Sequence, residues 1–250
     1  MTLLLAIRSR AGVVLASDGQ ATGDAPGHPT RAPIRKLRAI GGRVAWGASG
    51  SVGLAQTLEA ELRARSDEVL RAADPRPLLA GATIAVQQRA LAQHVALEDA
   101  SPPELACLFC WCDLETGHPR ILSVPRTGAE HQLHARHAAV GSGEVFAEAA
   151  MAGLGHVDVA TLGVHHLEIL AYRALADAIR VAAVHLGAPI QLFTVTVGEG
   201  AVERTELELE RSIAPATRAW NAAQAASLRA MAPPPPPSLI EIMRGLRETA

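Results

Sequence analysis

The 250-residue sequence lacks the features that define several large classes of protein. No stretch reaches the roughly 18 uninterrupted apolar residues that a membrane-spanning helix needs. The apolar run at residues 3–7 ends at Arg8 and has no basic segment before it, so it does not fit a secretory signal peptide. A net charge of −2 gives no electrostatic basis for binding nucleic acid or an anionic membrane surface. We therefore expect no nucleic-acid partner and no membrane partner.

Cysteine is scarce. The three cysteines, Cys107, Cys110 and Cys112, lie close together in the sequence. An odd number of cysteines without a signal peptide favours a reducing compartment, so we expect a cytoplasmic protein. Their spacing also suggests zinc, but the sequence offers no obvious fourth ligand and the surrounding segment is apolar. We interpret them as buried structural thiols, and we expect neither a metal nor another cofactor.

Lysine is scarcer still. Lys36 is the only lysine, and the other 22 of the 23 basic residues are arginine. A bias of the coding sequence explains why arginine replaces lysine wherever either will serve. A lysine that survives such a bias either survived by chance or serves a function. Lysine differs from arginine in its compact ammonium group and in a pKa that burial can lower.

Turn signals and apolar periodicity predict the order of the secondary structure. Strands, two helices, strands, two helices and strands follow one another, which differs from the strict alternation of a parallel sheet. The order predicts an α+β fold, a four-layer αββα sandwich of two antiparallel sheets. The expected strands are 2–7, 13–19, 34–40, 44–48, 105–113, 120–124, 131–140, 190–197 and 201–209; the expected helices are 51–69, 76–95, 144–154 and 164–185; residues 20–30 are expected to form a loop.

The sandwich domain is expected to span residues 1–212, with a C-terminal extension over residues 213–250. Residues 213–231 fit a further helix or an irregular tail. The five prolines at 233–237 predict a stiff polyproline spacer, and apolar residues at 239–246 predict a short amphipathic helix beyond it. That helix either folds back on this chain or on a neighbouring subunit, or serves as a docking peptide for a different partner.

The first predicted hairpin carries a residue of chemical interest, Thr2. A threonine at a free N-terminus holds a hydroxyl and an amine on adjacent carbons, so one residue supplies both nucleophile and base. Met1 directly precedes Thr2, so removal of the initiator methionine would expose it without cleavage of a propeptide. Residue type alone favours an ordinary strand residue, and the interest of Thr2 depends on its surroundings.

Three further features are expected to converge on Thr2. Neighbouring strands of the two N-terminal hairpins would place Asp18 and Lys36 beside it. A lysine there would favour the deprotonated amine and hydroxyl electrostatically, and Asp18 would hold that lysine charged and in place. The turn at Gly50 begins a predicted helix, and its backbone N–H groups suit a developing oxyanion.

These motifs resemble the β-type subunits of the proteasome and of its bacterial relatives, which are N-terminal-nucleophile hydrolases. The matching stretches are residues 12–22, 36–37, 47–51 and 139–143, and the likeness runs from residue 2 to about 209. It implies the same αββα sandwich. It also implies roles for individual residues: Thr2 as nucleophile, Asp18 and Lys36 as its charge network, Gly50 as oxyanion donor, Ser142 as a hydrogen-bonding partner of the Thr2 amine, and Ala21, Thr22, Ala48 and Val52 as substrate-binding positions.

The resemblance implies a threonine-type endopeptidase subunit of a self-compartmentalising assembly. Its partners would be further copies of itself in a ring, peptide or unfolded-protein substrates, and an ATPase or other regulator. The chain departs from the family at Ala183 and Leu186, where an aspartate and a serine often complete the network around the amine. Two alternatives follow: a catalytically weak or inactive ring scaffold, and a non-peptide amidohydrolase with the same N-terminal chemistry.

Overall fold

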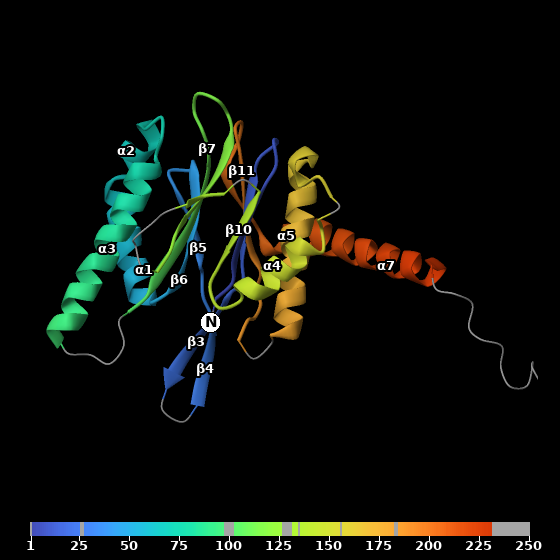
Figure 1. The fold of residues 1–250 in the computed structure, drawn as a ribbon, viewed down its shortest axis with the longest axis horizontal. Coiled ribbons are helices and arrows are strands. Elements are labelled where there is room, and N and C mark those ends of the chain that lie inside the picture. The colour runs from blue at the N-terminus through green and yellow to red at the C-terminus, as the bar shows by residue number, and fades with distance from the viewer. Residues whose placement is uncertain are drawn as a thin grey trace, which may run out of the picture.

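The computed structural model describes residues 2–25, 28–97, 103–126, 132–134, 136–155, 157–182 and 185–231. Two antiparallel sheets lie face to face, with helices on both outer sides (Figure 1). The first sheet runs in the order β10 (His137–Val140), β1 (Leu4–Arg8), β2 (Val13–Ser17), β11 (Gln191–Thr196), β12 (Gly200–Arg204). The second runs in the order β5 (Leu37–Ile40), β6 (Val44–Gly50), β7 (Leu105–Cys112), β8 (Pro119–Val124), β9 (Gln132–Leu133).

Helices cover the outer face of each sheet. The second sheet is covered by α1 (Val52–Ala64), α2 (Ser66–Arg71) and α3 (Arg76–Leu97). The first is covered by α4 (Glu144–Ala152) and α5 (Val164–Val181), with the short helix η1 (Val159–Thr161) between them. Among the described residues, no helix combines the length and hydrophobicity of a membrane span. The structure confirms the predicted αββα sandwich.

The side chains of β1 show why the N-terminal run is continuously apolar. Successive side chains of a strand point to opposite faces. Leu5 and Ile7 pack into the core beneath α4 and α5, whereas Leu4 and Ala6 pack into the core between the two sheets. All four side chains are fully buried. A strand that is covered on both faces has no position that favours a polar residue.

The three cysteines on β7 are all buried and unpaired. Cys107 faces the core under α1 and α3, whereas Cys110 and Cys112 face the core between the sheets. Burial raises the pKa of all three thiols, that of Cys112 to about 11. Because the thiols lie on opposite faces of the strand, they do not converge on one metal ion. No group of three or more His, Cys, Asp or Glu side chains that could hold a metal ion occurs among the described residues.

The predicted loop over residues 20–30 is wrong. β3 (Gln20–Ala25) and β4 (His28–Pro33) pair as an antiparallel ribbon outside both large sheets, and Figure 1 shows it extending from the body of the protein. Gly and Pro indicated a loop, but a free ribbon tolerates proline because each strand has an unpaired edge. The next strand accordingly begins at Leu37, later than the predicted residue 34.

Two other predicted elements are each divided in the structure. Residues 131–140 form no single strand, because β9 pairs with β8 in the second sheet and β10 pairs with β1 in the first. His131 itself lies outside the described residues. The predicted helix over residues 51–69 is interrupted at Arg65, which separates α1 from α2. Short segments that cross between layers carry too few residues for their pairing to be read from periodicity.

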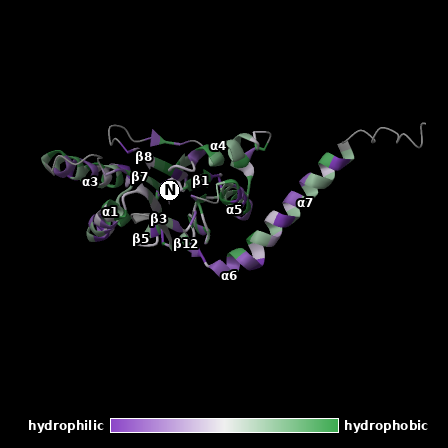
Figure 2. Ribbon diagram, turned by 90° about the horizontal axis from the view of Figure 1, so that it is seen from below, coloured by the Kyte–Doolittle hydropathy of each residue, from purple (hydrophilic) through white to green (hydrophobic). Residues whose placement is uncertain are grey.

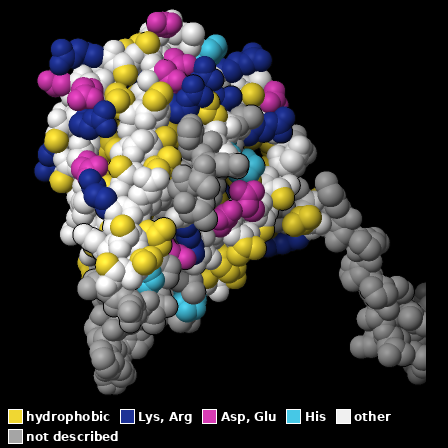
Figure 3. Space-filling view, turned by 60° about the vertical axis from the view of Figure 1, so that its left-hand side comes forward, with side chains coloured by type: hydrophobic (Ala, Val, Ile, Leu, Met, Phe, Trp, Pro, Cys, Tyr) yellow, Lys and Arg dark blue, Asp and Glu magenta, His cyan; other side chains and the backbone are white. Residues whose placement is uncertain are grey.

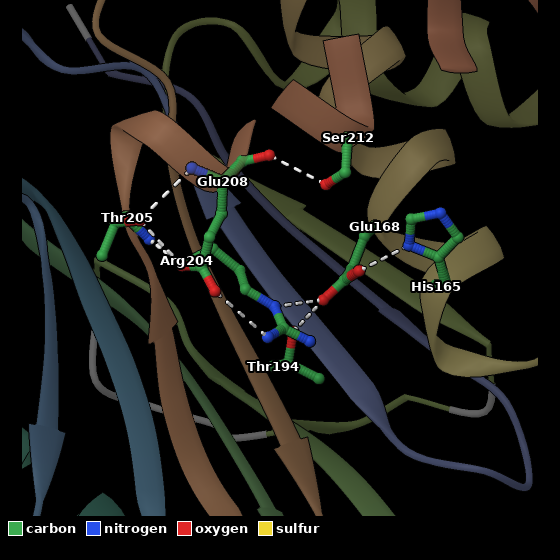
Figure 4. Close-up of polar contacts among 7 residues, drawn as sticks. All are labelled: His165, Glu168, Thr194, Arg204, Thr205, Glu208 and Ser212. Carbon is green, nitrogen blue, oxygen red and sulfur yellow. Dashed lines mark hydrogen bonds and ion pairs between the residues drawn. The ribbon is translucent and has the colours of Figure 1, made fainter. Parts of the chain in front are cut away.

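The predicted strand over residues 201–209 is wrong beyond Arg204. Thr205 begins a helical segment that continues through α6 (Glu206–Glu208), a π-helical turn (Leu209–Ile213) and α7 (Ala214–Met231). The Thr205 hydroxyl accepts a hydrogen bond from the Glu208 N–H (3.3 Å), and the Glu208 carboxylate accepts one from the Thr205 N–H (2.7 Å) (Figure 4). This capping box overrides the strand-like alternation of charged and apolar residues.

A buried carboxylate, Glu168 on α5, fixes the adjoining edge of the first sheet (Figure 4). It accepts hydrogen bonds from Thr194 on β11 (2.7 Å) and Arg204 on β12 (2.6 Å), and it contacts His165 (3.0 Å). Burial acts to raise the pKa of Glu168, but these hydrogen bonds hold it below its usual range. Glu168 therefore ties α5 to both strands as an ionised group.

α7 leaves the body of the protein at this edge. Figures 1 and 2 show it projecting away from the sandwich. It contacts the fold through Thr217, which is buried, through Trp220, whose ring lies 5.6 Å from the Arg173 guanidinium, and through Gln224, which accepts a hydrogen bond from Arg173 (2.7 Å). The predicted polyproline spacer and terminal amphipathic helix lie outside the described residues.

We expect Leu4→Ala to destabilise the protein by about 2–5 kcal/mol, because it opens a cavity between the two sheets. Equilibrium unfolding in urea measures the change. Leu114→Ala removes the same atoms from an exposed turn and should change stability by less than about 0.5 kcal/mol. Equal effects of the two substitutions would contradict the burial of Leu4 in the core between the two sheets.

Candidate active site

Asp18 is the polar centre of the site. It follows β2 directly and is fully buried. Its Oδ1 accepts hydrogen bonds from the Leu3 N–H (2.9 Å) and from the Lys36 ammonium (2.7 Å). Its Oδ2 accepts longer ones from the N–H groups of Gln20 (3.3 Å) and Gly187 (3.4 Å). Four donors replace the water that this carboxylate loses on burial, as a buried charge requires.

Lys36 lies immediately before β5 and is only 6 % exposed. The side-chain oxygen of Gln191 accepts a hydrogen bond from the Lys36 backbone N–H (2.8 Å) and so fixes the chain here. Burial lowers the pKa of the Lys36 ammonium below its ordinary value of 10.5, although Asp18 acts to raise it. Lys36 is therefore a cation in a poorly hydrated place, ion-paired with the buried carboxylate of Asp18.

The turn between β10 and α4 holds Thr2. The Thr2 nitrogen lies 3.2 Å from the Ser142 hydroxyl oxygen, and the Thr2 carbonyl accepts a hydrogen bond from the Gly143 N–H (3.2 Å). Gly141 has a φ of +110°, and a Cβ atom there would collide with the Thr2 carbonyl oxygen. The Gly-Ser-Gly turn thus combines a close backbone approach with a hydroxyl partner for the Thr2 nitrogen.

Thr2 lines a pocket between the two large sheets and α1. Three predicted substrate positions, Ala21, Ala48 and Val52, line the same pocket, as do Lys36 and Gly50. Gly50 ends β6 with a φ of +114°, and it lies at the N-terminus of α1, where Ser51 caps the helix. Thr22 follows Ala21 in β3, paired with Arg31 along the ribbon.

The structure brings the predicted site residues into one place. Six line the pocket, Asp18 lies beneath it, Ser142 contacts Thr2, and Thr22 adjoins it through the backbone of β3. Leu186 belongs to the hydrophobic core, and Ala183 lies outside the described residues. Beside Leu186, the backbone N–H of Gly187 reaches Asp18, so a main-chain donor serves the network there.

Sequence reasoning missed several neighbours of Thr2. Ile34, Arg35 and Arg38 line the pocket, and Gln191 positions Lys36 from β11. Alternation along the predicted strand places Arg38 on the same face as Lys36, so that spacing was a usable signal for Arg38. No local signal marks Gln191, because it is separated from Lys36 by 155 positions.

Comparison with known families identifies one match. A family model described as proteasome subunit matches residues 2–184. A comparison with curated proteins found no similar sequence. The matched region is most of the chain and includes Thr2, Asp18, Lys36, Gly50 and Ser142.

The pKa of Lys36 tests the electrostatics of the site, and selective ¹³C labelling of lysine gives a single NMR signal to titrate. We expect a folded-state pKa below 10.5 and a return to about that value in concentrated urea. Between these two values the unfolded chain binds more protons, so stability should rise with pH there. Asp18→Asn should lower the pKa further, because it removes the interaction that raises it. A folded-state pKa at or above the unfolded one would contradict the burial of this ammonium.

Proposed function

The chain belongs to the proteasome subunit family, and we propose that it is a threonine-type endopeptidase subunit whose nucleophile is Thr2. One observation carries the proposal. Thr2 opens onto a pocket with Lys36, above the buried Asp18, while its nitrogen contacts Ser142. A nucleophile, an electrostatic activator and a partner for the amine are the parts that N-terminal nucleophilic catalysis needs.

Removal of Met1 would give Thr2 a free α-amine. The amine takes the proton of the Thr2 hydroxyl as its oxygen attacks the peptide carbonyl, and the Gly50 N–H stabilises the resulting oxyanion. Collapse of this intermediate breaks the C–N bond, and the protonated amine delivers its proton to the leaving nitrogen. An ester to Thr2 remains. Water then attacks the ester with the amine as base, which releases the acid product and restores the hydroxyl.

Lys36 acts on these reaction steps through its charge. An ammonium close to Thr2 lowers the pKa of the α-amine and of the hydroxyl, so that the amine is free to accept a proton near neutral pH. Asp18 contributes indirectly, because its ion pair keeps Lys36 charged and positioned. The arrangement favours lysine over arginine. A guanidinium is planar, larger and presents its donors in a rigid fork, whereas the ammonium is a compact point charge.

The family supports assembly with other copies of the chain and action on peptides. We propose a ring-forming homo-oligomer that degrades peptides or unfolded proteins in the cytoplasm, with an ATPase or other regulator as a further partner. Three unpaired thiols support the reducing compartment. An inactive scaffold is the principal alternative, and the apolar Leu186 beside the site favours it; a non-peptide amidohydrolase is the second.

Thr2→Ala should lower kcat/KM on a peptide library at least about a thousandfold, because it removes the nucleophile. Lys36→Arg should also impair turnover severely. Thr57→Ala, which removes an exposed hydroxyl on α1, is the matched control and should retain activity. Turnover by purified Thr2→Ala would eliminate Thr2 as nucleophile, and normal turnover by Lys36→Arg would eliminate the requirement for a compact ammonium.

The state of the N-terminus supplies an independent check. Intact-mass spectrometry of the purified protein should find Met1 absent and Thr2 first. A chain that retains Met1 and still cleaves peptides would contradict the mechanism, because its Thr2 nitrogen would be an amide without basicity. Hydrolysis of small amides without any peptide turnover would favour the amidohydrolase alternative.

A further inference from the structure

The pocket beside Thr2 is lined by three cations, Arg35, Lys36 and Arg38. No carboxylate is among its described lining residues. Lys36 is paired with Asp18 beneath the pocket, and the exposed Arg35 is paired with Glu203 on β12 (2.5 Å). Arg38 differs from both, because the carboxylate that it contacts, Glu59, is shared with a second arginine.

Arg38 is held rigidly at the pocket wall. Its Nε donates to Glu59 on α1 (2.6 Å), its Nη1 donates to the Lys36 carbonyl (3.3 Å), and its guanidinium lies 5.4 Å from the centre of the Trp46 ring. The side chain is only 16 % exposed. Its Nη2 has no acceptor among the described residues. The guanidinium is therefore fixed in place with hydrogen-bonding capacity remaining.

The charge around Arg38 is incompletely balanced. Glu59 also accepts a hydrogen bond from Arg63 (3.0 Å), so one carboxylate is shared by two guanidinium groups. Elsewhere on the face formed by α1–α3, basic and acidic side chains lie next to one another (Figure 3). The cluster of Arg38, Glu59 and Arg63 thus retains a net positive charge beside the pocket.

The other pocket walls leave room for a short apolar stem. Ala21 and Ala48 present only methyl groups, and Ile34 and Val52 add branched aliphatic surface. Apolar walls with one fixed guanidinium complement a side chain that ends its short aliphatic stem in a carboxylate. A lysine or arginine side chain would meet like charge in the same space.

We propose that this pocket receives an aspartate or glutamate side chain of the substrate, with Arg38 as the specificity-determining residue. Thr2, the proposed nucleophile, lines this pocket, so the side chain that enters it would belong to the residue whose carbonyl is attacked. Cleavage therefore follows acidic residues. This inference rests on the proposed peptidase function and narrows its substrate class.

Four fluorogenic peptides test the inference. They differ only in the residue before the scissile bond, which is Glu in the first, Gln in the second, Leu in the third and Lys in the fourth. We expect kcat/KM for the Glu peptide to exceed that for its isostere Gln by about tenfold, the range of one good charged hydrogen bond. The Lys peptide should be the poorest. Equal rates for Glu and Gln in the wild-type protein would overturn the proposal without any variant.

Arg38→Met removes the charge at similar length and should reduce the Glu-to-Gln ratio to about one. Arg63→Met is the matched control: it alters the same cluster from an exposed position outside the pocket and should leave a clear Glu preference. A preference that survives in folded Arg38→Met would overturn the assignment to Arg38.

If no peptide is cleaved and Thr2 takes up no covalent probe, the proposed function fails. If the Leu and Glu peptides are cleaved equally, only the acidic preference fails.

Discussion

The buried ion pair between Asp18 and Lys36 is the interaction on which the rest of the site depends. Desolvation makes such a pair costly unless other hydrogen bonds satisfy its remaining atoms. Here the carboxylate also accepts from the backbone N–H groups of Leu3, Gln20 and Gly187. One carboxylate thus joins the N-terminus, the start of the ribbon and the segment that enters β11. Loss of either charged partner would leave the other as an uncompensated buried charge. Such a loss typically lowers the free energy of unfolding by about 3–5 kcal/mol.

The two-sheet architecture supplies the place for this pair. β1 and β2 of the first sheet bring Thr2 and Asp18, while β5 and β6 of the second bring Lys36 and Gly50 to the same end of the sandwich (Figure 1). The turn at Gly141 completes the enclosure, because the absence of a side chain there lets the backbone meet the Thr2 carbonyl. Apolar cores on both faces of β1 hold the strand rigid. Precise placement of Thr2 therefore follows from packing that extends well beyond the pocket.

Much of this arrangement was predictable from local chemistry. Continuous apolar runs indicated strands buried on both faces, and a lone lysine with Asp18 drew attention to the candidate site. The Gly-Ser-Gly turn was assigned to it only by the resemblance to the family. Elements in which the local residue pattern and the tertiary structure favour different conformations could not be predicted from that pattern. The ribbon over residues 20–33 contains Gly and Pro that resemble a loop, and the capping box at Thr205 ends a strand whose alternation otherwise continues. Gln191 and Gly187 contribute through the fold, since neither lies near Asp18 or Lys36 in the sequence.

In the proposed mechanism, Thr2 presents a hydroxyl and a free amine that act together on an electrophile. Peptide mapping by mass spectrometry after treatment with a peptide epoxyketone tests it most directly, because this probe forms a ring only with a nucleophile that carries both groups on adjacent carbons. We expect one cyclic adduct on the N-terminal peptide that begins at Thr2, and none on the Thr2→Ala protein. An unmodified N-terminus, or an adduct on another residue, would contradict it.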